Sequence, residues 1–143
     1  MTFAVREIEP GDAAAVSRLV EQLGYQRTPE QVGAWIQTAS GSRQAFVSSV
    51  DGEVVGWIAV SIEYPLQSPA YALIGGLVVK DGLRGHGMGR ALCQRAEAWA
   101  WEQGVEQLRV TSRSTRLDAH RFYLRDGYRQ LKVSLVFEKP APR

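Results

Sequence analysis

A glycine-rich segment that joins an apolar run to a helical pattern is the feature that most constrains this chain. The apolar run occupies residues 73–79, and the segment DGLRGHGMGR follows it at residues 81–90. Because apolar positions then recur at helical spacing, the order is strand, turn and helix N-terminus. Backbone N–H groups in the first turn of a helix have no intrahelical acceptor, and the helix dipole adds partial positive charge there. The segment therefore predicts an anion site, for which phosphate is the usual ligand.

The residues of this segment suit a phosphate in two further ways. Gly85, Gly87 and Gly89 let the backbone approach a ligand without interference from Cβ atoms. Arg84 and Arg90 add guanidinium groups whose paired N–H donors match phosphate oxygens. The segment is not a Walker A loop, because GxxxxGK[ST] is absent, and its glycines lack the dinucleotide-fingerprint spacing. The structural alternative is a turn that only connects a strand to a helix.

Two segments resemble motifs of a known family. Arg84-x-x-Gly87-x-Gly89 is similar to the pyrophosphate loop, (R/Q)-x-x-G-x-(G/A), of the GNAT superfamily of acetyl-CoA-dependent N-acetyltransferases. The segment AHRFYLRDGY at residues 119–128 resembles that family's later motif, A-x-x-(F/L)-Y-x-x-x-G-(F/Y). The two motifs occur in the family's order, and the resemblance covers residues 3–137. It bears on the fold and the cosubstrate much more than on the acceptor.

The pattern of elements predicts one α/β (α+β) domain over residues 1–143, with its core at about residues 3–138. The expected order is βααβββαβαββ, a mixed and mostly antiparallel sheet flanked by helices. Asp12 and Thr28 stand where the caps of the first two helices belong, and Asp51-Gly52 marks a hairpin. The expected strands lie at residues 3–8, 45–50, 54–62, 70–79, 108–111 and, as a closing pair, 128–137.

The strand before the glycine-rich segment contains the pair Gly75-Gly76, which predicts a bulge or a close approach of another backbone or a ligand. The resemblance implies that this strand splays from the next parallel strand and that pantetheine lies in the gap. It would be held by backbone N–H and C=O groups of Leu77, Val78 and Val79. The alternative, a buried strand, is compatible with that role.

The resemblance also implies that acetyl-CoA is the cosubstrate and that the glycine-rich loop binds its diphosphate. Within the loop, His86 would contribute its backbone N–H more than its ring. Arg116 stands in a basic run, residues 112–116, at a position where many relatives have asparagine; this run either binds the cosubstrate or only caps a helix. The expected cosubstrate contacts, besides the strand, are Arg84, Gly85, His86, Gly87, Met88, Gly89, Arg90, Arg116 and Tyr123.

Acetyl transfer from a thioester to an amine requires a base and is helped by an acid. An alkyl amine has a pKa of about 10, by analogy with lysine, so it is mostly protonated at neutral pH. A thiol has a pKa of about 8.5, so its thiolate leaves more easily when an acid protonates it. The resemblance implies that Tyr123 is this acid and that the amine attacks directly in a ternary complex. The alternative is an amphipathic core tyrosine.

The base is less determined by the sequence. Glu63 ends the expected third strand and is the leading candidate, although a residue at a strand end is often only a surface residue. Gly75 stands where relatives with an I-E-x-L-x-V pattern carry a glutamate. His120, three residues before Tyr123, is a second candidate. Cys93 lies inside the expected long helix without a neighbouring base and is better explained as a packing residue.

The acceptor is expected to be a small primary amine. Residues Gly24-Tyr25 resemble members that acetylate small amines, including aminoglycoside-type enzymes, and Trp35, Trp57 and Tyr64 join Tyr25 as aromatic candidates for a pocket. A protein N-terminus or lysine is the second candidate acceptor. A different possibility is a module that binds acyl-CoA without catalysis.

Composition narrows the remaining classes. The net charge of +2 and the scattered arginines do not favour nucleic acid, and no apolar run reaches the length of a membrane span. Residues 1–10 do not resemble a signal peptide, and a single cysteine suits the cytoplasm. Two histidines and one cysteine without ligand spacing predict no metal site. The edge strands leave a homodimer open.

Overall fold

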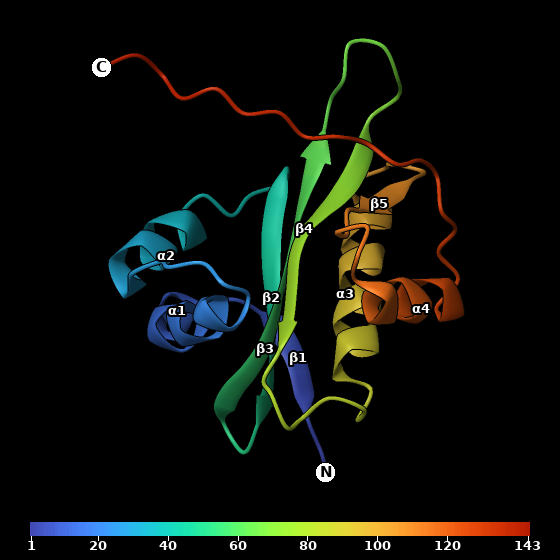
Figure 1. Cartoon of the computed structure of the whole chain (residues 1–143). Helices are drawn as coiled ribbons and strands as arrows, with labels where there is room; N and C mark the ends of the chain where they lie inside the picture. The colour runs from blue at the N-terminus through green and yellow to red at the C-terminus, as the bar shows by residue number, and fades with distance from the viewer. The chain divides into compact units, whose positions relative to one another are not determined.

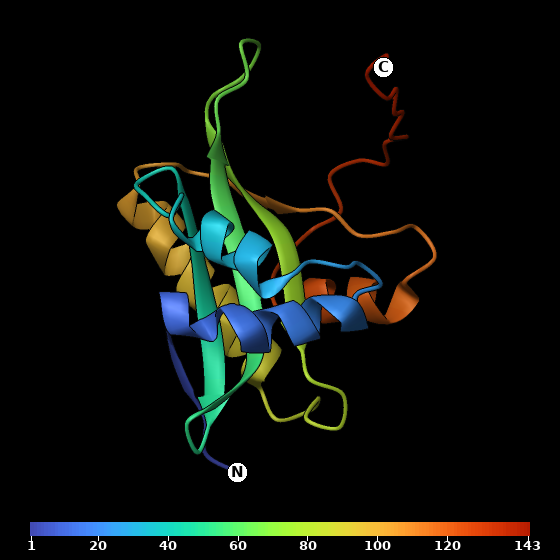
Figure 2. The ribbon, with the colours of Figure 1, turned by 90° about the vertical axis from the view of Figure 1, so that its left-hand side faces the viewer.

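The computed structural model describes residues 1–143 and consists of two compact units, residues 1–111 and residues 112–143. The first unit is a five-stranded sheet with α1 and α2 on one face and α3 on the other (Figures 1 and 2). Its strands are β1 (Ala4–Glu7), β2 (Arg43–Val50), β3 (Glu53–Glu63), β4 (Tyr71–Val79) and β5 (Leu108–Val110). Its helices are η1 (Pro10–Asp12), α1 (Ala13–Gln22), α2 (Pro29–Ile36) and α3 (Met88–Glu102).

The sheet follows the chain in the order β1-β2-β3-β4-β5. Neighbouring strands are antiparallel except β4 and β5, which are parallel and joined by α3. Asp51 and Gly52 close the β2–β3 hairpin with φ values of 51° and 81°, the positive values that a type I′ turn requires. The predicted α/β class, the mixed sheet and this hairpin are therefore confirmed.

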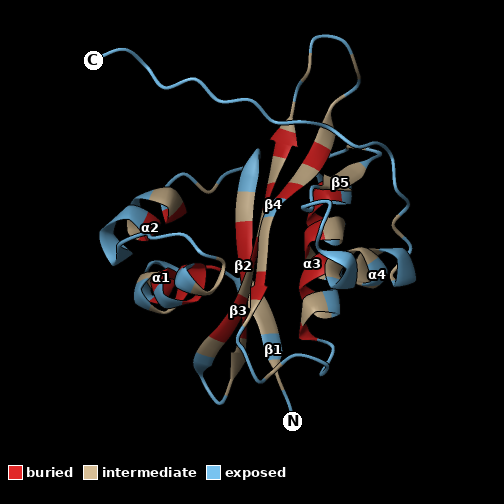
Figure 3. Ribbon diagram, in the orientation of Figure 1, coloured by how far each residue is buried: buried red, intermediate tan, exposed pale blue.

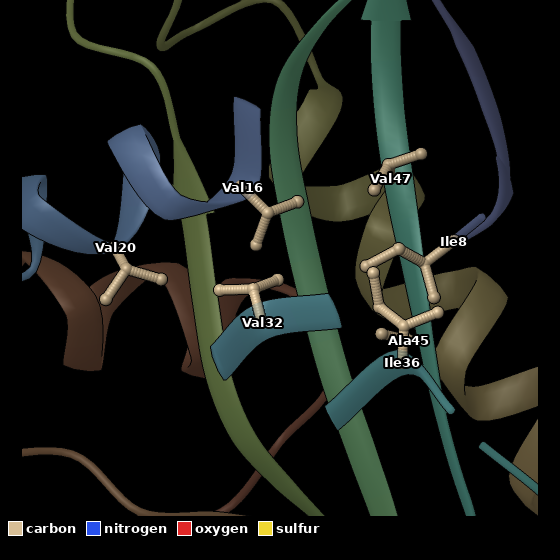
Figure 4. Packing of buried hydrophobic residues seen from close by; sticks show 7 residues of the cluster. All are labelled: Ile8, Val16, Val20, Val32, Ile36, Ala45 and Val47. Atoms are coloured by element: carbon tan, nitrogen blue, oxygen red, sulfur yellow. The ribbon is translucent and has the colours of Figure 1, made fainter. Parts of the chain in front are cut away.

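Neighbouring residues of a strand point to opposite faces of the sheet. Apolar residues occupy both sets of positions, so both faces of the sheet are apolar. On β2, Phe46 and Val47 are adjacent and both are fully buried. On α3, the face predicted from helical spacing is confirmed, and Figure 3 shows it as a buried stripe. The cluster beneath α1 and α2 consists of Ile8, Val16, Val20, Val32, Ile36, Ala45 and Val47 (Figure 4).

Asp12 does not cap α1 as its position predicted, since its side chain makes no capping bond to that helix. Its carboxylate instead accepts hydrogen bonds from both terminal nitrogens of Arg6, at 2.8 and 2.9 Å, and from the Glu9 N–H at 2.7 Å. The Arg6 hydrogen bond holds the pKa of Asp12 below its ordinary value of 3.8; burial opposes this effect and the Glu9 bond adds to it. The short helix η1 lies between β1 and α1. Through its bonds to Arg6, the Asp12 carboxylate connects β1 to the start of α1.

The second unit contains α4 (Leu117–Arg125) and no strand, so the expected closing strand pair at residues 128–137 is not formed. The alternation of Leu131, Val133 and Leu135 fits a strand, but a strand also needs backbone partners, and no strand of the chain pairs with this segment. These three side chains are 55–80% exposed. In both units, no helix has the length and apolar content needed to cross a bilayer.

Replacing Asp12 tests the ion pair with Arg6. Asp12→Asn should lower the free energy of unfolding at pH 7 by about 2 kcal/mol, because a charged hydrogen-bonded group is lost. Since the folded-state pKa of Asp12 is depressed, its contribution is complete above about pH 4 and disappears as pH falls through the folded-state pKa. Urea denaturation at several pH values should therefore show the wild type and the variant converging in acid.

The matched control is Asp51→Asn, at an exposed turn position where asparagine also accepts positive φ. That variant should follow the wild type at every pH. A difference between Asp12→Asn and the wild type that stays constant down to pH 2 would contradict the assigned role.

Candidate functional site

The glycine-rich loop and the start of α3 lie where the sequence predicted an anion site. Gly82, Gly85 and Gly87 have φ values of 87°, 86° and 85°, which only glycine adopts without strain. The first hydrogen bond of α3 runs from the Ala91 N–H to the Gly87 carbonyl at 3.0 Å. Amide groups that precede Ala91 therefore have no acceptor within the helix, and most of the loop around them is exposed.

The loop is anchored from the core side. The Met88 side chain is 1% exposed, and its sulfur lies 3.9 Å from the Ser48 hydroxyl. Met88 can therefore offer a ligand only its backbone. Arg84 is 60% exposed, and one of its terminal nitrogens lies 3.4 Å from the Asp81 carboxylate. A guanidinium with one carboxylate contact at the surface keeps N–H donors for a phosphate.

The bulge predicted from Gly75-Gly76 is present, and it lies beside a short parallel pairing. The register between β3 and β4 shifts after Gly76, so that Gly75 has no opposite residue on β3. Strand β5 pairs with β4 only along residues 72–74, although β4 continues to Val79. The last part of β4 thus extends beyond its parallel neighbour, as the resemblance implied, and its edge is not covered by β5.

Gln22 holds the end of β4 and the start of the loop, a role that sequence reasoning missed. Its side-chain nitrogen donates to the Val79 carbonyl at 2.8 Å, and its side-chain oxygen accepts from the Asp81 N–H at 2.9 Å. The Val79 carbonyl therefore already accepts one hydrogen bond, which leaves its second lone pair and its N–H for the role that the resemblance implies. Leu77 and Val78 keep the expected position on β4, with the Val78 side chain only 3% exposed. No local pattern marks a glutamine 57 residues before its partner.

A hollow of about 360 Å³ opens on the α1–α2 face of the sheet. Two of the four aromatic candidates line it, Trp35 and Trp57, whereas Tyr25 and Tyr64 are 59% and 73% exposed and lie outside it. A Cβ atom on Gly76 would lie 2.5 Å from the Trp57 ring, so this glycine gives the indole its place. The complete lining is Trp35, Arg43, Trp57, Ala59, Val60, Ser61, Leu73, Gly75 and Gly76.

Glu63 adjoins this hollow through Ser61. The two residues lie on the same face of β3, and the Ser61 hydroxyl donates to a Glu63 carboxylate oxygen at 3.1 Å. Both side chains are half-buried. A carboxylate bonded to a hydroxyl that faces a hollow can remove a proton from a group bound there.

The second unit carries Tyr123, Arg116 and His120. The Tyr123 ring packs edge-on against Phe122 and Tyr128, with ring centres 5.2 and 5.5 Å away. Arg116 is the residue before α4 and makes no side-chain cap. His120 Nε2 lies 2.8 Å from the Arg113 carbonyl, and because a carbonyl only accepts, this nitrogen carries hydrogen. That nitrogen is therefore not available as a base.

The acetyltransferase (GNAT) family model matches residues 14–128, most of the chain. The chain belongs to the acetyltransferase (GNAT) family. An aminoalkylphosphonate N-acetyltransferase of Salmonella typhimurium is 40% identical to it over 81 residues, 56% of this chain and about half (53%) of that relative's length. An aminoglycoside N(6')-acetyltransferase type 1 of Stenotrophomonas maltophilia is 26% identical over 143 residues, 95% of this chain and 92% of the relative.

Solved structures agree on the fold of this acetyltransferase. AAC(6')-Iy in complex with the bisubstrate analogue CoA-S-monomethyl-acetylneamine has a TM-score of 0.86 at 16% identity, covering 99% of this chain and 100% of that one. A putative acetyltransferase from Agrobacterium tumefaciens has a TM-score of 0.83 at 23% identity, covering 95% and 99%. The predicted enzyme class, an acetyl-CoA-dependent N-acetyltransferase, is confirmed by the family match.

The residues of the acetyltransferase fit acetyl-CoA as its cosubstrate. The start of α3 offers amide donors and an exposed glycine loop to a diphosphate, and Arg84 adds a cation. The last residues of β4 offer backbone groups to an amide-containing arm. No group of three or more His, Cys, Asp and Glu side chains is placed to hold a metal ion.

The two hydrogen bonds between Gln22 and the loop predict that loss of this side chain weakens acetyl-CoA binding. Gln22→Ala removes two hydrogen bonds that hold the loop, so the dissociation constant for acetyl-CoA should rise about tenfold. Titration calorimetry measures this constant directly. Gln26→Ala, at an exposed position between α1 and α2, is the control and should bind as the wild type does. Equal affinity in both variants would mean that the loop keeps its conformation without Gln22.

Proposed function

We propose that this acetyltransferase transfers the acetyl group of acetyl-CoA to the primary amine of a small molecule. The observation that carries the proposal is the hollow beside the β4 bulge, in the same unit as the glycine loop. Its volume of about 360 Å³ lies in the range of small-molecule sites. The names of the Salmonella and Stenotrophomonas relatives also denote small amines.

A protein N-terminus or lysine remains the alternative acceptor. A peptide would need an extended groove or a free strand edge to bind its backbone. The hollow instead has two indoles and short side chains on one sheet face, which favours a small molecule. The non-catalytic alternative is a module that binds acyl-CoA only, and the turnover test below separates it from an enzyme.

The reaction we propose is direct attack of the amine in a ternary complex. The Glu63 carboxylate, through the Ser61 hydroxyl, removes a proton from the amine, so that its nitrogen lone pair forms the new C–N bond. The C=O double bond then re-forms and the C–S bond breaks. Tyr123 donates its hydroxyl proton to the departing sulfur and regains a proton from solvent. The nitrogen gives its second proton to solvent after the C–N bond has formed, so that it ends as an amide, and the sulfur ends as a thiol.

We further propose that both units belong to one N-acetyltransferase domain over residues 1–143, because the family match continues across the boundary at residue 111. Arg84, Arg90 and Arg116 would bind phosphate groups of the cosubstrate. A cytoplasmic location fits a chain with a single, buried cysteine, Cys93, and cell fractionation tests it. A homodimer would give the exposed apolar segment at residues 131–137 a partner, and light scattering should then report twice 15.8 kDa.

The proposed function is tested by binding and then by turnover. Free acetyl-CoA at about 100 times its dissociation constant should stabilise the protein by about 2.7 kcal/mol, which a thermal-shift measurement detects. A panel of primary amines should then release coenzyme A thiol at a rate that depends on the amine. Binding without release for every amine would favour the non-catalytic module. An unmoved melting temperature would refute the proposal.

Tyr123→Phe tests the proposed acid. Loss of the phenolic proton should lower kcat by about 100-fold or more, while the acetyl-CoA thermal shift stays as in the wild type. Tyr25→Phe, at a 59% exposed position, is the matched control and should keep full turnover. An unchanged kcat in Tyr123→Phe would exclude this residue as the acid, and a lost thermal shift would indicate a binding or structural role.

A further inference from the structure

We propose that the acceptor amine also carries an acidic group, and that Arg43 binds this group. The inference rests on the proposed function, since it names the class of amine that the hollow takes. Phosphonate and carboxylate groups both match a guanidinium through paired N–H donors. A short amine of this kind is a zwitterion at neutral pH.

The charges around the hollow carry the inference. Arg43 is the one ionisable side chain in its lining; the other eight residues are uncharged, and none is a carboxylate. Glu63 stands next to the hollow and is bonded to Ser61. An acceptor with several ammonium groups would place positive charge near the Arg43 guanidinium, and the Glu63 carboxylate alone would not balance that charge. Binding of such an acceptor is therefore unfavourable. One cation and one anion beside each other suit a ligand with one charge of each sign.

Arg43 has no strong partner, unlike Arg6 and Arg109 of the same unit. Its guanidinium makes one long hydrogen bond, 3.4 Å, to the Thr38 hydroxyl and no ion pair. By contrast, Arg6 binds Asp12 through two nitrogens, and Arg109 stacks on the Tyr71 ring at 4.1 Å. The Arg43 donors are therefore available to a ligand at the rim of the hollow.

The register of the sheet sets the distance between the two ends of the ligand. Arg43 is directly opposite Ser61 on β3, and Ser61 is opposite Leu73 on β4. The bulge at Gly75 lies about two residues further along β4, which corresponds to about 7 Å. An acidic group at Arg43 and an amine near the bulge are thus separated by only a few covalent bonds.

The walls between these two ends are apolar. Trp35 reaches the hollow from α2, Trp57 and Ala59 from β3, and Leu73 from β4. The edges and faces of indole rings suit a short hydrocarbon stem and not a sugar ring with many hydroxyl groups. The geometry therefore points to a short aminoalkyl acid, with its stem between the tryptophans, its acidic group at Arg43 and its amine toward the bulge at Gly75.

The test compares amines of matched length in thiol-release kinetics. Aminoethylphosphonate and β-alanine carry an acidic group, propanolamine replaces it by a hydroxyl, and an aminoglycoside carries several ammonium groups. The wild type should show a kcat/KM for at least one acidic amine about tenfold or more above that for propanolamine. Equal or higher values for propanolamine or the aminoglycoside would overturn the inference while leaving the proposed function intact.

Variants of Arg43 locate the effect. Arg43→Gln should raise KM for the acidic amine about 10- to 100-fold with little change in kcat, and should change KM for propanolamine less than threefold. Arg43→Lys should recover part of the loss, because it restores the charge but not the paired donors. Arg18→Gln, at an exposed position on α1, removes the same charge elsewhere and should match the wild type.

Three further results would contradict the inference or the proposed function. An Arg43→Gln variant that loses all amines equally, or loses its acetyl-CoA thermal shift, would assign Arg43 to structure and overturn the inference. Turnover of no amine at all, with acetyl-CoA still bound, would refute the proposed function, and the inference would fall with it. Discrimination that survives Arg43→Gln would show that another group binds the acid.

Discussion

The parallel pairing of β4 with β5 stops after three residues, and the candidate site depends on that stop. The bulge at Gly75 shifts the register beside β3, and the rest of β4 continues without its parallel neighbour. Backbone groups that a longer ladder would consume are thereby left for a ligand. The same stretch of β4 ends at the glycine loop, so one strand leads from the hollow to the anion site.

The loop itself contributes little to its own stability. Its glycines take positive φ values in the folded protein. Glycine has more conformational freedom than other residues in the unfolded chain, so ordering these glycines costs conformational entropy. Contacts outside the loop offset this cost: Met88 is buried in the core, and Gln22 binds the backbone on both sides of the turn. The candidate anion site therefore lies on a loop that contacts from the rest of the structure hold at both ends.

Local patterns predicted the elements and failed where a partner on another element decides. Asp51-Gly52 formed the expected hairpin turn and Thr28 the expected helix cap, because both depend on contacts within a few residues. Asp12 was wrong as a helix cap because Arg6, on another element, competes for the same carboxylate. The closing strands were wrong because alternation predicts a suitable surface but supplies no partner strand.

The sequence by itself determined the glycine loop at the start of α3, the bulge and the family, since these follow from residue types at fixed local spacing: the glycines before a helical pattern, Gly75-Gly76, and the motif around Tyr123. The tertiary structure alone decided which groups meet: Gln22 with the backbone of Val79 and Asp81, and Trp35 with Arg43 around one hollow. The physical reason is range. A turn or a helix start depends on neighbours in the chain, whereas a pocket depends on strand register and packing between elements that no local pattern records.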